Sequence, residues 1–264
     1  MPIEKLNGID LYYEVHGSGE PLLLIMGFGA QSFQWYEQVP VLSKEYQVII
    51  FDNRGVGNSE RPNYPYTMKH FVDDISALLD FLKIDSAHIC GISMGGMIAL
   101  QFVLAHPERV KRLIILATSY IGADVGLLVR FIAMGESAPV EVRAKGTLQL
   151  LFSKPYQEKV LQDEALWKEF LRRFTENPTT LQDHKNQANA ISQHDVRDRL
   201  PEIQKPTLIM VGTNDALLPP RNSRRIAKGI TNSELVILSG PGHGLIVEAA
   251  DEVNAKILEF LQKK

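Results

Sequence analysis

The sequence predicts an α/β fold in which helices flank a mostly parallel central sheet and a helical insertion interrupts the pattern. Short runs of Ile, Leu and Val recur along the chain, and most are followed by a turn signal and then by a helical pattern. The runs are apolar throughout, as expected of parallel strands that are buried on both faces. Residues 119–200 contain only helical periodicities, such as Trp167, Phe170 and Phe174. We therefore expect a core domain of residues 1–118 and 201–264, with the insertion at 119–200.

The strands follow from these apolar runs. The chain opens with a predicted hairpin, because Asn7-Gly8 separates two strand-like segments and is a preferred two-residue turn. The buried strands of the sheet are expected at 22–26, 47–51, 88–92, 113–118, 207–211 and 234–238.

Helices fill the gaps between the strands. Thr67 is a plausible N-cap for a helix whose apolar face is Phe71, Ile75, Leu78, Leu79 and Leu82. A second helix begins at about Met94 and ends before Pro107, because the residue before a proline resists the α conformation. Two more are expected at about 221–228 and 251–263, the last with Val253, Ile257, Phe260 and Leu261 facing inward. Strands that alternate with helices in this way indicate a parallel, doubly wound sheet.

The composition is that of a globular domain with a sizeable core. Hydrophobic residues make up 45% of the 264 residues, and 28 Lys and Arg against 31 Asp and Glu give a net charge of -3. This balance argues against a nucleic-acid partner, and no apolar run is long enough to span a membrane. Cys90 is the single cysteine, so no internal disulfide can form, which suits a cytoplasmic location. The basic cluster Arg221, Arg224 and Arg225 is interpreted as a solvated helix face.

The strongest chemical signal is Gly91-Ile92-Ser93-Met94-Gly95, which lies between a predicted strand and a predicted helix. Such a sharp turn holds the serine in a strained conformation and lifts its hydroxyl above the sheet. Strand and helix crowd each other there, so the positions two before and two after the serine need minimal side chains. Ser93 is therefore the predicted nucleophile.

A serine nucleophile needs a general base, and the base needs an orienting acid. In this architecture the acid and the histidine follow later strands, in that order. Asp215 follows the strand predicted at 207–211, and His243 lies in a glycine-rich loop after the strand predicted at 234–238. Asp124 and Asp195 are weaker rivals for the acid. The remaining histidines are expected to have structural or surface roles: His16, His70, His88, His106, His184 and His194.

The oxyanion of the reaction needs two backbone donors. Met94 N–H lies at a helix N-terminus, and Phe28 N–H lies in the loop after the first buried strand, so these two are the predicted pair. The glycine-rich turn at 52–59 lacks the Lys-Ser/Thr ending of a phosphate loop and is interpreted as structural. Cys90 is interpreted as a small core residue. No metal-ligand spacing occurs, so we expect no metal and no cofactor.

Together these residues resemble the α/β-hydrolase superfamily, in its branch of small esterases, enol-lactonases, cofactor-free haloperoxidases and carbon–carbon bond hydrolases. The resemblance spans nearly the whole chain and rests on the 52–59 turn, the turn at Ser93, the Gly212–Asp215 loop and Gly242-His243. Family members usually carry His-Gly at the oxyanion loop, whereas this chain has Met26-Gly27.

The resemblance implies that the insertion at 119–200 is a cap over the active site and supplies apolar pocket residues. The candidate pocket residues are Gly27, Phe28, Leu128, Ile132 and Leu217. We expect a carboxylic ester hydrolase that acts on uncharged esters of short- to medium-chain acids, with water as the second substrate. An enol-lactone, thioester or carbon–carbon bond hydrolase would use the same triad. A signal-binding receptor of the same fold is a further alternative. The oligomeric state is left open.

Overall fold

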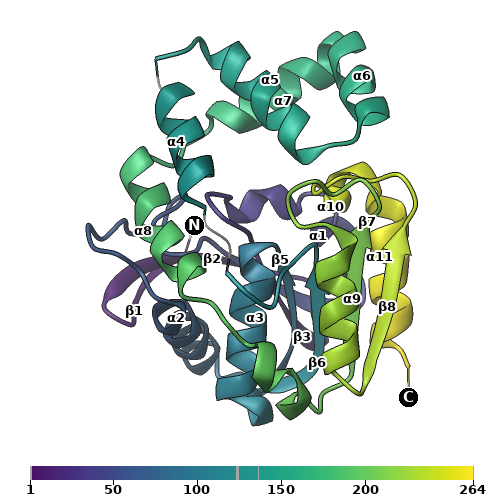
Figure 1. The fold of residues 1–264 in the computed structure, drawn as a ribbon. Coiled ribbons are helices and arrows are strands. Elements are labelled where there is room, and N and C mark those ends of the chain that lie inside the picture. The colour runs from purple at the N-terminus through teal and green to yellow at the C-terminus, as the bar shows by residue number, and fades with distance from the viewer. Residues whose placement is uncertain (1, 123–124, 136, 264) are drawn as a thin grey trace.

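The computed structural model describes residues 2–122, 125–135 and 137–263, and within them eight strands form one sheet (Figure 1). The strand order is β1-β2-β4-β3-β5-β6-β7-β8. The bounds are β1 Ile3–Leu6, β2 Ile9–His16, β3 Glu20–Ile25, β4 Tyr46–Phe51, β5 Ala87–Ile92, β6 Val110–Leu116, β7 Thr207–Gly212 and β8 Ser233–Leu238. The strands β3 to β8 pair in parallel, whereas β1 pairs with β2 and β2 with β4 in antiparallel fashion. The mostly parallel sheet is confirmed.

The predicted hairpin joins β1 to β2. Asn7 and Gly8 both have positive φ, at 47° and 79°, which is the conformation that a two-residue turn of this kind requires. The strand predicted at 113–118 is β6, which begins three residues earlier and ends at Leu116. Ala117 takes a positive φ of 42°, so the backbone leaves the sheet before Thr118.

Helices cover both faces of the sheet. The helices α2 Met68–Phe81, α3 Met94–Ala105 and α9 Pro220–Gly229 pack on one face, and α1 Val39–Leu42 and α11 Ala250–Leu261 pack on the other. Thr67 and His70 form a capping box at the start of α2, so the predicted N-cap is confirmed. The short helix α10 Leu245–Glu248 and the 3₁₀ segments Ser32–Trp35, Pro107–Arg109 and Arg197–Glu202 complete the core. No helix in the described residues is long and apolar enough to cross a membrane.

The segment between β6 and β7 is helical. It contains α4 Gly126–Gly135, α5 Val140–Leu151, α6 Lys154–Gln162, α7 Glu164–Thr175 and α8 Leu181–Ser192. Figure 1 shows α5, α6 and α7 beyond one end of the sheet, while α8 descends beside the core. Polar contacts attach α8 to the core, because Tyr66 N–H donates to the Asn186 carbonyl and Asn189 Nδ2 donates to the Tyr66 carbonyl.

The two ends of this segment meet in a short antiparallel bridge. Ile121 pairs with Asp195, and Val196 N–H donates to the Tyr120 carbonyl over 2.9 Å. His194 lies at this junction with 1% of its surface exposed. Its Nε2 lies 3.2 Å from the Ser119 carbonyl and its Nδ1 lies 3.3 Å from Gln101 Nε2. A neutral ring satisfies both contacts, and burial lowers the pKa of His194 to about 4.

The low pKa of His194 makes the stability of the fold depend on pH. Between pH 6.5, where an unfolded histidine titrates, and about pH 4, the unfolded chain binds a proton that the folded chain does not. The contribution of His194 to the unfolding free energy is therefore complete above pH 6.5 and is lost as the pH falls. We expect a loss of about 2 kcal/mol between pH 7.5 and pH 5.0.

Urea unfolding at the two pH values measures this loss. The variant His194→Gln lacks the titrating group, so its unfolding free energy should fall less over the same interval. Equal falls in the two proteins would show that His194 does not titrate as described.

Candidate active site

Ser93 occupies the turn between β5 and α3 in a conformation that L-residues rarely adopt, with φ 56° and ψ -121°. The surrounding backbone holds it there. Ser93 N–H donates to the Leu116 carbonyl over 2.9 Å, and the Ser93 carbonyl accepts from Thr118 Oγ1 over 2.7 Å. Strain of this kind costs about 1–3 kcal/mol and persists only where the neighbouring structure fixes it.

The flanking glycines allow the close approach of strand and helix. A Cβ on Gly91 would lie 2.2 Å from the Gly95 carbonyl oxygen, and a Cβ on Gly95 would lie 2.2 Å from the Ile25 carbonyl oxygen. A Cβ on Gly96 would lie 2.6 Å from the Thr118 side chain. No side chain fits at these positions, which explains the glycines that flank Ser93 in the sequence.

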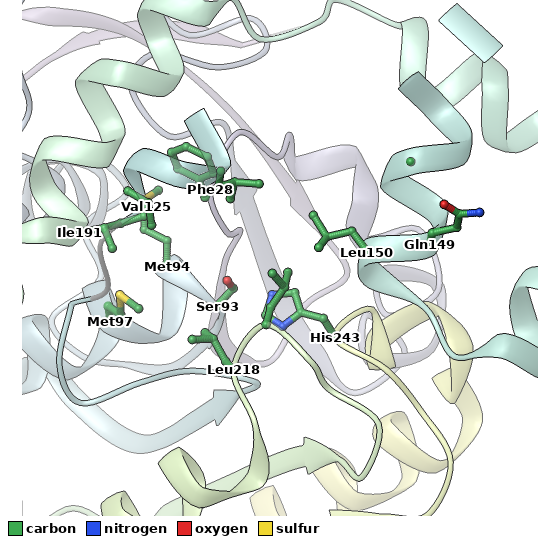
Figure 2. A pocket seen from close by; sticks show the side chains of 13 residues that line it. Phe28, Ser93, Met94, Met97, Val125, Gln149, Leu150, Ile191, Leu218 and His243 are labelled. Atoms are coloured by element: carbon green, nitrogen blue, oxygen red, sulfur yellow. The ribbon is translucent and has the colours of Figure 1, made fainter. Parts of the chain in front are cut away.

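His243 and Asp215 are joined by a hydrogen bond of 2.8 Å between Nδ1 and Oδ2. Both side chains are buried, and the other carboxylate oxygen of Asp215 accepts from Leu217 N–H and Leu218 N–H. Since an ionised carboxylate only accepts hydrogen bonds, the proton of the neutral imidazole lies on Nδ1. The Nε2 lone pair is then free to accept a proton. His243 and Ser93 line the same cavity (Figure 2).

Two backbone donors lie beside Ser93. Within the described residues, neither Phe28 N–H nor Met94 N–H has a hydrogen-bond partner in the protein. Gly27 precedes Phe28 and packs against the nucleophile, since a Cβ on Gly27 would lie 3.0 Å from Ser93 Cβ. The loop after β3 therefore lies against Ser93, so Phe28 N–H remains a candidate oxyanion donor.

Polar side chains from elsewhere in the chain hold this loop. Gln187, fully buried on α8, accepts from Gly29 N–H over 2.8 Å and donates from Nε2 to the Arg54 carbonyl. Thr179 Oγ1 donates to the Gly29 carbonyl, and Asn53 Nδ2 donates to the Met26 carbonyl. The loop is thus anchored without an imidazole at position 26.

The cavity above Ser93 has a volume of about 640 Å³. In Figure 2, Met97, Val125 and Ile191 lie on one side of Ser93, and Leu150 and Gln149 lie on the other, beyond His243. Apart from His243, none of the described residues around it carries a titratable side chain. The lining residues are Phe28, Ser93, Met94, Met97, Val125, Leu128, Gly146, Gln149, Leu150, Ile191, Leu217, Leu218 and His243.

The structure brings together most of the residues proposed from the sequence. Phe28, Leu128 and Leu217 line the cavity, whereas Gly27 and Ile132 do not. Gly27 packs on Ser93 instead, and Ile132 lies one turn beyond Leu128 along α4.

One rival acid and two of the other histidines have partners away from Ser93. Asp195 pairs with Arg197, His88 bonds Glu20, and His194 serves the junction described above. Asp124 lies outside the described residues. His184 does lie near the site, since its ring packs edge-on against that of Phe28 and a Cβ on Gly29 would lie 2.5 Å from its Nε2.

Among the cavity residues that the sequence did not identify are Met97, Gln149, Leu150 and Ile191, and it also did not identify the supporting residue Gln187. Met97 lies one turn after Ser93 on α3, so its spacing from the nucleophile could have identified it. The others belong to the helices between β6 and β7, whose packing no local pattern reveals.

The turn at 52–59 is structural. Asp52 is buried and accepts from Ser32 N–H, Ser32 Oγ and Asn58 N–H, and burial raises its pKa. Arg54 makes a buried bidentate ion pair with Asp74, with contacts of 2.7 and 2.5 Å. The part of the chain that the structure describes contains no group of His, Cys, Asp and Glu that could hold a metal ion.

Comparison with known proteins agrees with this fold. The family profile described as the α/β-hydrolase fold matches residues 20–250. A protein named as a carbamate hydrolase, RutD of Azorhizobium caulinodans, is 32% identical over 98% of this chain and 98% of its own. The enol-lactonase of Burkholderia xenovorans LB400 superposes with a TM-score of 0.89 at 28% identity, over 99% of this chain and 100% of the other. A thermophilic esterase from Thermogutta terrifontis gives 0.84 at 26% identity, over 96% and 93%.

Gln187 offers a test of the anchoring of the oxyanion loop. The variant Gln187→Leu leaves Gly29 N–H and the Arg54 carbonyl without partners, which should lower the unfolding free energy by about 2 kcal/mol. Because Gly29 adjoins Phe28, we also expect kcat for a p-nitrophenyl ester to fall about tenfold, less than the 10²–10³-fold that loss of a donor costs.

Asn189→Ala is the matched control. It removes a hydrogen bond from the same helix to the Tyr66 carbonyl, away from the loop. Its stability should fall with little change in kcat. Equal kcat losses in the two variants would assign the effect to α8 as a whole.

Proposed function

Since this chain belongs to the α/β-hydrolase fold family, we propose that it hydrolyses carboxylic esters with uncharged, short- to medium-chain acyl groups through Ser93, His243 and Asp215. The observation that carries the proposal is the arrangement of a strained Ser93 and a His243 with a free Nε2 at one apolar cavity. Among the described residues, no carboxylate, lysine or arginine lines the cavity, which favours an uncharged substrate because a buried charge needs a partner.

The reaction follows from these positions. Ser93 Oγ attacks the ester carbonyl while His243 Nε2 takes the hydroxyl proton, and Asp215 stabilises the imidazolium that forms. The N–H groups of Phe28 and Met94 bind the oxyanion. The tetrahedral intermediate collapses, His243 gives its proton to the leaving alcohol, and the acyl group stays on Ser93. Water then attacks the acyl-enzyme with His243 as base, which releases the acid and restores the serine.

The cavity also supports an assignment of the two substrate parts. His243 protonates the leaving alcohol, so the alcohol belongs on the side of Leu150 and Gln149. The acyl group then belongs on the side of Met97, Val125 and Ile191, which is apolar (Figure 2). We propose that residues 119–200 act as a cap, since they supply Leu128, Gln149, Leu150 and Ile191 to the wall. A cytoplasmic location is part of the proposal and rests on the single, buried Cys90.

Enol-lactone hydrolysis is the second candidate. It is favoured by the similarity to the Burkholderia xenovorans enol-lactonase along the whole chain. A lactone would use the same nucleophile, base and oxyanion donors, and its leaving oxygen would remain tethered to the acyl group. Parallel assays with simple esters, lactones and aryl carbamates separate these possibilities. Tight binding of a small molecule without turnover would instead favour a receptor.

The first test is a p-nitrophenyl ester series from acetate to laurate at pH 7–8. The wild-type protein should turn over the short and medium esters, and Ser93→Ala should lose at least about 10⁴-fold in kcat. Ser192→Ala is the control, since Ser192 is exposed at the end of α8 and does not line the cavity. Activity that survives in Ser93→Ala would disprove the assignment of the nucleophile.

Val125→Phe tests the acyl side. The phenyl ring is larger than the valine side chain and narrows that side of the cavity. The ratio of kcat/KM for p-nitrophenyl octanoate to that for the acetate should therefore fall at least about tenfold. Leu150→Phe is the matched change on the other side of the cavity. In this variant, kcat/KM should fall more for esters of large alcohols than for esters of small alcohols with the same acyl group. If Val125→Phe instead discriminates by alcohol size and Leu150→Phe by acyl length, the acyl and alcohol sides of the cavity are the reverse of those proposed.

A further inference from the structure

The loop that carries His243 is tied on both sides to the turn between α5 and α6. Gly244 N–H donates to the Leu151 carbonyl over 2.8 Å. On the other side, Gly242 N–H donates to Glu248 Oε2 over 2.9 Å. The Glu248 carboxylate also accepts from Ser153 N–H over 3.1 Å and from Ser153 Oγ. Glu248 therefore bridges the histidine loop and the insertion.

The two segments are in direct contact. A Cβ on Gly242 would lie 2.6 Å from the Leu151 carbonyl oxygen, and a Cβ on Gly244 would lie 2.5 Å from the ring of Phe152. No side chain fits between the histidine loop and the 151–153 segment. A shift of this segment would therefore either move the histidine loop or break the hydrogen bonds that join the two.

The Glu248 carboxylate has no cationic partner among the described residues, and its known contacts are hydrogen bonds from Gly242 and Ser153. Hydrogen bonds to an ionised carboxylate are about twice as strong as those between neutral groups. This side chain is therefore well suited to fix a loop that otherwise contains three glycines, namely Gly240, Gly242 and Gly244. Glycine-rich loops have a large conformational freedom to lose.

The ring of His243 has little tolerance for movement. Its Nδ1 must stay on Asp215 while its Nε2 serves Ser93, and a misplacement of about 1 Å can cost 10²-fold in rate. The helix that ends at Leu151 also supplies Gly146, Gln149 and Leu150 to the cavity wall. The same helix thus contacts the substrate space and holds the histidine loop.

We infer that Glu248 is a positioning residue, which uses the seated 151–153 segment to hold His243 in the orientation needed for proton transfer. This inference rests on the proposed function of His243 as the base. It gives the insertion a second role, because the insertion then fixes a catalytic loop as well as enclosing the substrate.

Three variants of the full chain test the inference with p-nitrophenyl butyrate. Glu248→Ala removes all three hydrogen bonds, so kcat should fall about 10–100-fold while KM changes less than about threefold. Glu248→Gln should retain kcat within about threefold, because its amide oxygen accepts from both N–H groups and its amide nitrogen donates to Ser153 Oγ. Ser153→Ala removes one contact and should give an intermediate loss.

The conservative variant separates positioning from general destabilisation. Unchanged kcat in Glu248→Ala would overturn the inference, and so would equal losses in Glu248→Ala and Glu248→Gln when both are folded. If Glu248→Ala does not fold, Glu248→Asp takes its place, since a shorter carboxylate cannot reach both Gly242 and Ser153. In that case kcat should fall in Glu248→Asp and stay near the wild-type value in Glu248→Gln. A wild-type kcat in Glu248→Asp would overturn the inference.

A second readout keeps the inference distinct from the proposed function. A fluorophosphonate labels an activated serine without any ester specificity, and this reaction also needs the base. If no ester is hydrolysed, the proposed function fails, but the labelling rate of Ser93 should still be lower in Glu248→Ala than in Glu248→Gln. Equal labelling rates in these two variants would overturn the inference itself.

Discussion

The rest of the site depends on the contact between β5 and α3 at Ser93. A side chain on Gly91 would collide with the backbone of Gly95, and one on Gly95 would collide with the Ile25 carbonyl at the end of β3. Ser93, between these two glycines, has a positive φ. The position of Ser93 is therefore set by main-chain packing in the centre of the sheet. In the proposed mechanism, every other catalytic group must be brought to this fixed point by a loop.

The loops that carry Phe28, Asp215 and His243 are far from Ser93 in the sequence, and different contacts hold each of them in place. Asp215 is fixed by the N–H groups of its own loop, at Leu217 and Leu218. The oxyanion loop and the histidine loop instead depend on contacts from residues between β6 and β7, namely Gln187 and the segment at 151–153. The loops that carry Phe28 and His243 are thus both joined by hydrogen bonds to the segment between β6 and β7.

The sequence predicted the features that topology determines. Parallel strands all end at one edge of the sheet, so residues that directly follow strands, such as Ser93, Asp215 and His243, can be placed together from sequence order. Gln149 and Gln187 could not be placed in this way. Each lies on an amphipathic helix, and the periodicity identifies its apolar face without revealing which part of the core that helix contacts.

The residue at position 26 shows why such contacts matter. The resemblance to the family led us to expect an imidazole there, whereas Met26 is buried in an apolar cluster. The polar anchoring of the oxyanion loop comes instead from Asn53 on the core and from Gln187 and Thr179 on the insertion. The hydrogen bonds from Gln187 and Thr179 form only while the segment between β6 and β7 packs against the core. The anchoring of the loop at Phe28 is therefore shared between the core and the segment from which Leu128, Gln149, Leu150 and Ile191 line the cavity.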